Sequence, residues 1–197
     1  MGGALWKAFA FGAVVAGSIG PIALLIFGIA ARRGLSAGAL AGLGAGLADL
    51  IYALVAFWAG ALILPLVAAH ETAIRIGGAL LLIGLGLSML LNQRRPISTP
   101  ATADSFLSIF LLTIVNPMTV VVFAGIVPQL PVAGSPANAA WFALALCAGS
   151  VLVQFLIAGF GAALGSALPG EGPRRAINIA AAAGILAFGI YGLVAAG

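Results

Sequence analysis

The stretch GSIGPIALL, residues 17–25, places Gly20 and Pro21 in the middle of an uncharged apolar run from residue 8 to residue 31. A proline inside a helix has no N–H to donate, and its ring clashes with the carbonyl four residues earlier, here that of Gly17. The stretch therefore predicts a helix that is broken near its centre. What such a break does depends on the solvent around it.

A second break is predicted in TIVNPMTVV, residues 113–121, where Asn116 precedes Pro117 in another apolar run. Pro117 clashes in the same way with the carbonyl of Thr113. In lipid, a freed carbonyl is costly unless another group of the protein satisfies it. A plain kink is the simpler interpretation of either proline alone, but two central breaks favour a functional one.

The composition places the chain in a bilayer. It has 197 residues, of which 63% are hydrophobic and only 6% are charged, whereas soluble domains carry about 25% charged residues. The net charge of +4 comes without a basic stripe interleaved with aromatic residues, so nucleic acid is not an expected partner. The single cysteine, Cys147, excludes an internal disulfide.

Six apolar segments are long enough for a membrane-spanning helix, which takes about 20 residues. They are residues 8–31, 38–64, 73–91, 106–127, 138–167 and 176–196, with connections that include residues 65–71 and the PGEGPRR stretch, residues 169–175. The first segment is too long for a signal-peptide core, so it is expected to be retained. The predicted fold is an all-α membrane protein with six transmembrane helices, the first and fourth broken at Gly-Pro and Asn-Pro.

Arginine pairs predict the orientation of these helices. The connections after the first, third and fifth segments carry six arginines, Arg32, Arg33, Arg94, Arg95, Arg174 and Arg175, whereas the opposite side carries Lys7 and Arg75. By the positive-inside rule, the arginine-pair connections are cytoplasmic. Both termini are then outside a multi-pass protein of the cell (inner) membrane.

The two halves of the chain resemble each other. A shift of 103 residues aligns AIRIGGALLLIGLGL (73–87) with AINIAAAAGILAFGI (176–190), with Gly86 on Gly189, and a shift of 96 puts Pro21 on Pro117. Three helices per half is an odd number, so the second half must cross the membrane in the opposite sense. We therefore expect one transmembrane domain over residues 1–197, built from inverted repeats 1–97 and 98–197, an architecture typical of secondary transporters.

Asp49 is the one acidic residue near the middle of any of the six segments. A carboxylate at that depth costs roughly 3 kcal/mol on insertion scales, so it is interpreted as functional. Gly38, Gly42 and Gly46 share its helix face and predict close packing against another helix. Because desolvation disfavours the charged form, the hypothesis is that Asp49 alternates between protonated and ionised states. A carboxyl that merely bonds a neighbouring helix is the alternative.

Other intramembrane polar residues extend the candidate site. Gln154 lies near the middle of its segment, one position from the repeat equivalent of Tyr52, and either contacts substrate or bonds another helix. Serine and threonine in membrane helices usually bond their own backbone, so Ser150 and Thr113 carry little weight. The predicted substrate and proton pathway comprises Gly20, Pro21, Asp49, Tyr52, Asn116, Pro117 and Gln154.

These motifs, taken in order, resemble the lysine exporter (LysE/RhtB-type) family. The Gly-Pro of the first segment is followed by ARRGLSAG, GLGAGLADLIY and Asn-Pro, and the resemblance covers essentially the whole chain. It implies a dimeric exporter of amino acids or similar small metabolites, driven by the proton gradient. It places functional weight on Gly20, Pro21, Asp49, Asn116 and Pro117. Where the commonest family pattern has Asn and Lys after the two prolines, this chain has Ile22 and Met118.

Three other classes of membrane protein differ from an exporter in the residues that they need. A metal-ion permease would need clustered carboxylate, His or Cys ligands, and the chain has one His and one Cys. An intramembrane enzyme would need a nucleophile with its base, or a motif such as HExxH, and the sequence shows neither. Nothing in the sequence calls for a cofactor or a bound metal. A non-transporting scaffold stays possible and would be favoured by straight helices through both prolines.

Overall fold

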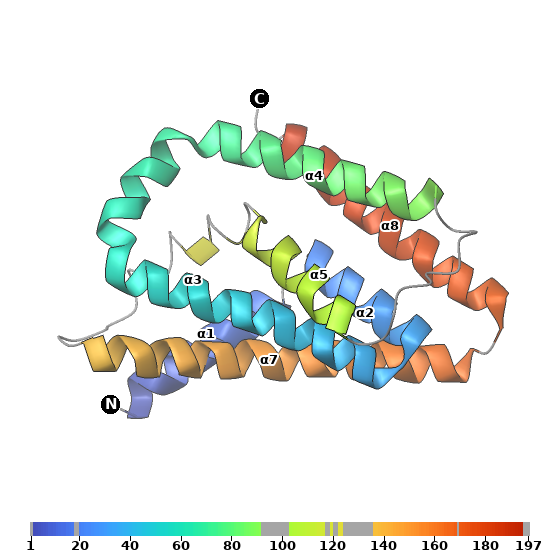
Figure 1. The fold of residues 1–197 in the computed structure, drawn as a ribbon, viewed down its shortest axis with the longest axis horizontal. Coiled ribbons are helices and arrows are strands. Elements are labelled where there is room, and N and C mark those ends of the chain that lie inside the picture. Colours follow the sequence, from blue (N-terminus) through green and yellow to red (C-terminus); the bar gives the residue numbers. More distant parts are fainter. Residues whose placement is uncertain are drawn as a thin grey trace.

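The computed structural model describes residues 2–17, 20–91, 103–116, 119, 122–123, 136–168 and 170–194 (Figure 1). These residues form helices and no strand. The helices are α1 (Gly2–Gly17), α2 (Pro21–Arg33), α3 (Leu35–Ala69), α4 (Glu71–Leu91), α5 (Ala103–Ile114), α7 (Pro136–Ala167) and α8 (Glu171–Val194). Within this part of the chain, four helices are long and apolar enough to cross a membrane, or five if α1 and α2 form one broken span.

The break predicted in the first segment is confirmed. Helices α1 and α2 meet at an angle of 72°. Gly20 caps α2 in an extended conformation (φ −123°, ψ 176°), and Pro21 is the first residue of α2. A proline is well suited to that position because its missing N–H would have no partner within the helix. The sequence thus starts a new helix at Pro21 instead of merely bending the old one.

Two predicted connections are wrong in extent. Residues 65–69 continue α3, with Pro65 inside the helix, and α3 turns sharply near this end (Figure 1). Proline removes one backbone hydrogen bond and bends a helix without necessarily ending it. Helix α8 begins at Glu171, so that Pro173 lies in its first turn, where proline costs no hydrogen bond.

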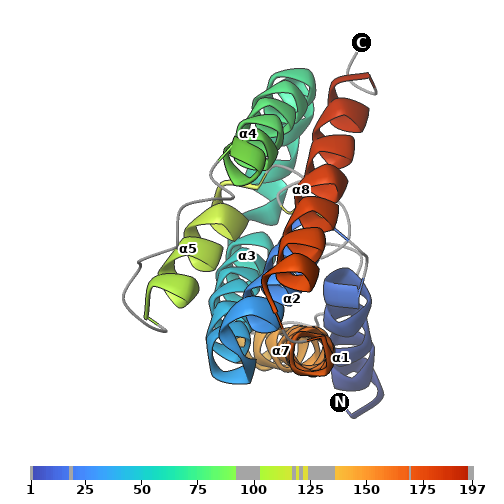
Figure 2. The same cartoon turned by 90° about the vertical axis from the view of Figure 1, so that its right-hand side faces the viewer.

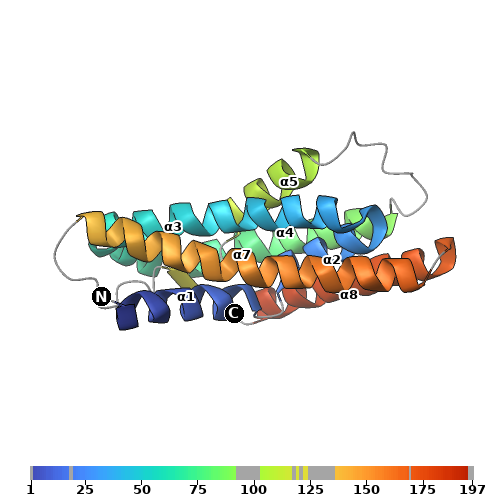
Figure 3. The same cartoon turned by 90° about the horizontal axis from the view of Figure 1, so that it is seen from below.

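The helices pack in three tiers (Figure 2). Helix α7 contacts α1, α2 and α3, and α5 packs on α3, whereas α4 and α8 form a pair that α2 connects to the rest. Helices α1 and α5 lie on opposite sides of the α3–α7 pair (Figure 3). Facing positions show that α3 and α7 are antiparallel: Gly38 with Ala158, Gly42 with Gln154 and Gly46 with Val151.

The α4–α8 pair is held by reciprocal contacts. A Cβ added at Gly86 of α4 would lie 2.6 Å from Cγ of Leu186, and one added at Gly189 of α8 would lie 2.7 Å from Cγ1 of Ile83. Both differences, 189 − 86 and 186 − 83, equal 103. Each contact is therefore the counterpart of the other under the shift that aligns the two segments. Small residues let the two backbones approach this closely.

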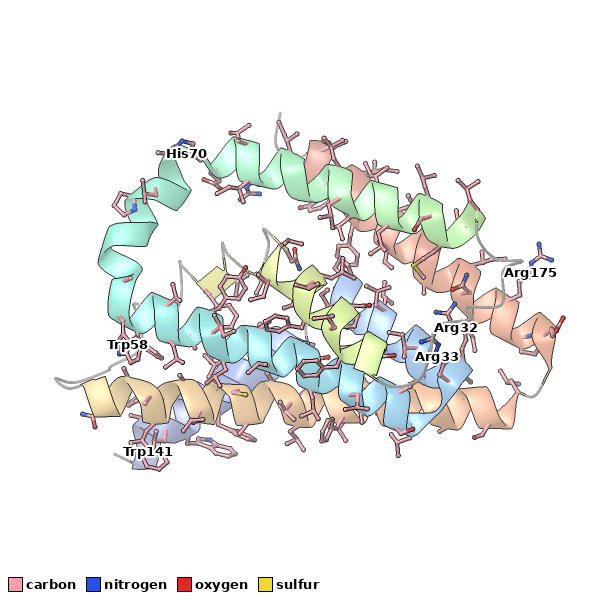
Figure 4. All side chains as sticks on the ribbon, in the orientation of Figure 1. Arg32, Arg33, Trp58, His70, Trp141 and Arg175 are labelled. Carbon is pink, nitrogen blue, oxygen red and sulfur yellow. The ribbon has the colours of Figure 1, made fainter. Side chains whose placement is uncertain are left out.

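The ends of the molecule differ in chemistry (Figure 4). Arg32, Arg33 and Arg175 lie at one end, and Trp58 and Trp141 lie at the other. We call these the arginine end and the tryptophan end. Tryptophan is enriched where a membrane helix meets the headgroup region, and both of these side chains are largely exposed. The distribution is that of a protein with its long axis across the membrane.

At the arginine end, a polar network joins three helices. Arg32 Nη1 of α2 donates to Asn178 Oδ1 of α8 at 2.5 Å, and Asn178 Nδ2 donates to the carbonyl of Met89 of α4 at 3.3 Å. The chain then turns from α2 to α3 at Gly34, whose φ of 88° suits glycine better than other residues. These contacts fix the second half of the broken helix to the α4–α8 pair.

Candidate functional site

Buried polar side chains form a layer between two apolar clusters. The cluster toward the arginine end includes Leu25, Ile26, Ala41, Ala45, Ile109, Ala158 and Ile185. The cluster toward the tryptophan end includes Ala8, Ala53, Ala56, Phe123, Phe142, Ala143 and Leu146. Buried polar residues that lie between these positions along the chain are Asp49, Thr113, Asn116, Ser150 and Gln154. The break at Gly20 also falls between Ala8 and Leu25, at the same level.

The centre of this polar layer is a contact between Asp49 of α3 and Ser150 of α7. Asp49 is 4% exposed and Ser150 is fully buried. The Ser150 hydroxyl donates to Asp49 Oδ2 at 2.5 Å. The carboxyl therefore faces another helix and not lipid, as its sequence setting predicts.

The three glycines expected to allow close packing line this side of α3. A Cβ at Gly42 would lie 2.9 Å from Cβ of Gln154, and one at Gly38 would lie 2.5 Å from Cβ of Ala30 in α2. A Cβ at Gly46 would overlap the side chain of Val151. Replacing any of them would push α3 away from its neighbours and separate Asp49 from Ser150.

Tyr52 connects α3 to the end of α5. Its hydroxyl donates to the carbonyl of Ile114, the last residue of α5, while its ring packs 5.5 Å from that of Phe123. The sequence predicted that the Thr113 carbonyl would lose its helix partner. That carbonyl instead accepts the N–H of Asn116 at 3.1 Å, because the chain tightens by one residue there. The carbonyl satisfied by a side chain is that of Ile114.

Replacing Tyr52 by Phe should lower the apparent melting temperature of the detergent-solubilised protein by several degrees. The substitution leaves a half-buried carbonyl without its donor, at about 1–3 kcal/mol, and each kcal/mol corresponds to roughly 2–4 °C for a chain of this size. Tyr191→Phe is the matched control, because Tyr191 is 69% exposed and should have no effect. Equal melting temperatures for both variants would show that the Tyr52 hydroxyl stabilises nothing.

Gln154 is the member of the layer with an unsatisfied atom. Its side chain is 4% exposed, and its Oε1 has no hydrogen-bond partner among the described residues. The preceding residue, Val153, is the neighbour that a Cβ at Gly17, the last residue of α1, would meet at 3.7 Å. Gln154 therefore lies close to the level of the helix break, and a buried amide oxygen of this kind can accept a hydrogen bond from a ligand.

The two breaks contribute backbone groups at this level. Asn116 is buried and non-helical, and its carbonyl accepts the N–H of Thr119 at 3.1 Å; Pro117 lies outside the described residues. At the other break, Pro21 opens α2 behind Gly20, an N-cap residue that has no side chain to bond the first turn. The first turn of a helix carries partial positive charge, so this end of α2 favours an anionic group.

Ionisable side chains are sparse around the polar layer. No group of three or more His, Cys, Asp or Glu side chains comes together in the described part of the chain. Cys147 contacts the Gly46 carbonyl at 3.3 Å. Among the described residues, the layer offers one ionisable carboxyl bonded to a serine hydroxyl and one glutamine amide oxygen without a donor, which suits proton binding and the recognition of a small polar molecule.

Ser150 is a site residue that the sequence alone gave little weight, because a serine in a membrane helix usually bonds its own backbone. The other hydroxyl set aside in this way, that of Thr113, does bond its own helix, donating to the carbonyl of Ile109 at 2.7 Å. Ser150 bonds across the interface instead. One signal in the sequence was available: the shift of 103 residues that aligns 73–87 with 176–190 also puts Gly46 on Gly149, the residue before Ser150.

Comparison with known proteins gives one family. The family model described as LysE type translocator matches residues 13–196, which include every residue of the polar layer and both breaks. No curated protein and no solved structure matches the chain.

Proposed function

Because the chain belongs to the LysE type translocator family, a family of membrane exporters, we propose that it exports small amino acids or related small metabolites by proton antiport. The observation that carries this proposal is the buried Asp49, held between α3 and α7 at the level where helix α1–α2 breaks by 72°. A broken helix beside an ionisable intramembrane group is the usual construction of a secondary transport site.

Asp49 is the proposed proton carrier. Among the described residues, its carboxyl accepts a hydrogen bond from Ser150 and no cation pairs with it. Such a carboxylate gains stability by binding a proton when its surroundings exclude water. Binding a proton on one side of the membrane and releasing it on the other would couple inward proton flow to outward substrate flow.

The substrate is proposed to bind at the two breaks. A carboxylate of the substrate would face the start of α2 at Gly20 and Pro21, where the helix dipole is positive. Its ammonium or hydroxyl donors would face Gln154 Oε1 and the break at Asn116 and Pro117. The unpartnered state of Gln154 Oε1 supports this assignment, because a buried acceptor without a donor is costly.

Six spans in two inverted repeats, residues 1–97 and 98–197, are the proposed architecture. Two facts support it. The α4–α8 contacts are reciprocal under the 103-residue shift. In addition, α1 packs on α7 and α5 packs on α3. A pseudo-two-fold axis that exchanges α1 with α5 and α3 with α7 would convert the first of these contacts into the second. The family resemblance adds a homodimer, with each protomer carrying its own site.

The orientation can be tested by cysteine labelling. In a Cys147→Ser background, His70→Cys at the tryptophan end should react with a membrane-impermeant maleimide in intact cells. Arg175→Cys at the arginine end should react only after the membrane is opened, because arginine-bearing ends are retained in the cytoplasm. The reverse pattern would invert the proposed topology.

Transport in proteoliposomes tests the function itself. Purified protein would be reconstituted, a proton gradient imposed, and a panel of labelled amino acids followed, with protein-free liposomes as the control. Gradient-dependent movement of one or more small amino acids is expected. A panel that moves at the control rate would contradict amino-acid export and return the scaffold to consideration, although the 72° break is not what a scaffold of straight helices would show.

A further inference from the structure

We infer that Ser150 is a hydroxyl switch that transmits the charge of Asp49 to helix α1 through the carbonyl of Leu146. The inference rests on the proposed function in that it takes Asp49 as the proton carrier. It adds a positioning residue and a direction of coupling: from the carboxyl on α3, across α7, to the first half of the broken helix.

Ser150 differs from three other helix hydroxyls, those of Ser88, Thr113 and Ser166. Ser88 and Ser166 donate to carbonyls three residues earlier in their own helices, and Thr113 donates four residues back. This local bond is the ordinary state of a helical serine or threonine. For Ser150 the corresponding acceptor would be the carbonyl of Leu146, yet its hydroxyl donates to Asp49 on the neighbouring helix instead.

The Leu146 carbonyl, which accepts a backbone N–H within α7 but not the Ser150 hydroxyl, faces α1. A Cβ added at Gly12 of α1 would overlap the carbonyl oxygen of Leu146, and one added at Gly149 of α7 would overlap the carbonyl oxygen of Phe9. The backbones of α1 and α7 therefore touch at the Leu146 carbonyl. A change in the hydrogen bonding of this oxygen therefore alters the α1–α7 contact directly.

The two charge states of Asp49 give Ser150 two different bonds. An ionised carboxylate only accepts hydrogen bonds, so Ser150 must donate to it. When hydronium in adjoining water transfers a proton to the carboxylate, one O–H bond forms on Asp49 and a water molecule is left. The new O–H can donate to Ser150 Oγ, and the serine hydroxyl, which keeps its own hydrogen, can rotate to donate to the Leu146 carbonyl. The added proton stays on Asp49 until water accepts it again.

Few other ionisable groups can interfere with this exchange. Tyr52 on the same helix and Cys147 on α7 are close enough to interact electrostatically with Asp49. From α2, Arg32 and Arg33 lie at the far, arginine end of the helix. Replacing Ser150 therefore alters the one direct side-chain bond to the carboxyl and leaves these charges in place.

The test is an infrared titration of the purified protein, in which the carboxylic acid band absent from Asp49→Asn identifies Asp49. In Ser150→Ala, the midpoint of that band should move toward higher pH by about 1–2 units, the value of one hydrogen bond to a charged group. Ser150→Thr, which keeps the hydroxyl, should restore the midpoint. Ser105→Ala is the matched control, because Ser105 is equally buried and no contact to Asp49 involves it.

The transmission to α1 needs a second readout. Spin labels at Trp6 of α1 and Leu164 of α7, both exposed, in a Cys147→Ser background should report a distance that changes with pH. The change should disappear in Ser150→Ala while it persists in Ser105→Ala. An unshifted infrared midpoint in Ser150→Ala, or a pH-dependent distance that survives that substitution, would overturn the switch.

Failure of the switch and failure of the proposed function can be told apart. If wild-type protein shows no proton-driven transport in liposomes, the proposed function fails, whereas the infrared and distance measurements still report on Ser150 because neither needs a substrate. If transport is proton-driven and the Ser150→Ala midpoint is unshifted, the function stands and the switch is wrong.

Discussion

Asp49→Asn should reduce proton-driven export to the rate of protein-free liposomes while leaving substrate counterflow intact. Asn has nearly the shape of Asp, and its amide can still meet the Ser150 hydroxyl that lies 2.5 Å from the carboxyl. The variant is therefore expected to fold and to bind substrate. The asparagine side chain cannot gain or lose a proton, so the substitution removes proton coupling and leaves folding and substrate binding in place. The measurement is uptake of a labelled substrate with and without an imposed pH gradient.

A matched acid serves as the control for this experiment. Glu71 is exposed and forms an ion pair with Arg75 at 2.6 Å on the surface of α4, where such pairs contribute little. Glu71→Gln should transport as the wild type does. Gradient-driven accumulation that survives in Asp49→Asn would remove Asp49 from the coupling mechanism and leave it a packing role between α3 and α7.

Gly161→Leu should detach α2 from α7 and strongly destabilise the protein. A Cβ at Gly161 would lie 2.5 Å from the carbonyl oxygen of Phe27 and 3.1 Å from Cβ of Ala30, so even an alanine cannot be accommodated without moving backbone. A leucine should cost about 3 kcal/mol, the upper part of the usual range for overpacking. The apparent melting temperature should fall by about 6–12 °C, and export should be lost with it.

The same substitution two residues away is the control. Gly159 lies on α7 with nothing within 4 Å of an added Cβ. Gly159→Leu should leave the melting temperature unchanged or raise it slightly, because leucine favours the helical state over glycine by about 0.5–1 kcal/mol. If both variants lost stability equally, the close α2–α7 contact would not be the cause.

Much of the fold follows from composition and from one proline. The helix break at Pro21 is encoded locally, because Gly-Pro inside an apolar run admits few alternatives, and the structure confirms it. The all-helical class follows from runs too long for strands. Pro65 shows the limit of such local reasoning. Proline starts a helix at position 21 but lies inside α3 at position 65. Whether a proline ends a helix or only bends it depends on the tertiary packing around it, which the local sequence does not contain.

The candidate site was predictable where a residue is unusual for its surroundings. Asp49 stands out because a carboxyl is expensive inside a membrane, and the structure places Gln154 and Asn116 in the same buried layer. Ser150 does not stand out, because serine is common in membrane helices and normally bonds its own backbone. The bond between Tyr52 and Ile114 joins residues 62 positions apart, a distance over which periodicity carries no information.

The reciprocal packing of Gly86 and Gly189 has a consequence for the chain as a whole. The seam between α4 and α8 has the form of an isologous interface, in which the same patch of surface meets its own copy across a two-fold axis. Such a surface is self-complementary, so it can bind a second copy of itself. In the inverted-repeat architecture proposed above, a three-helix polypeptide that ended in this helix would already carry the surface needed to pair with an identical, oppositely oriented molecule, and joining two such polypeptides would give residues 1–97 followed by residues 98–197.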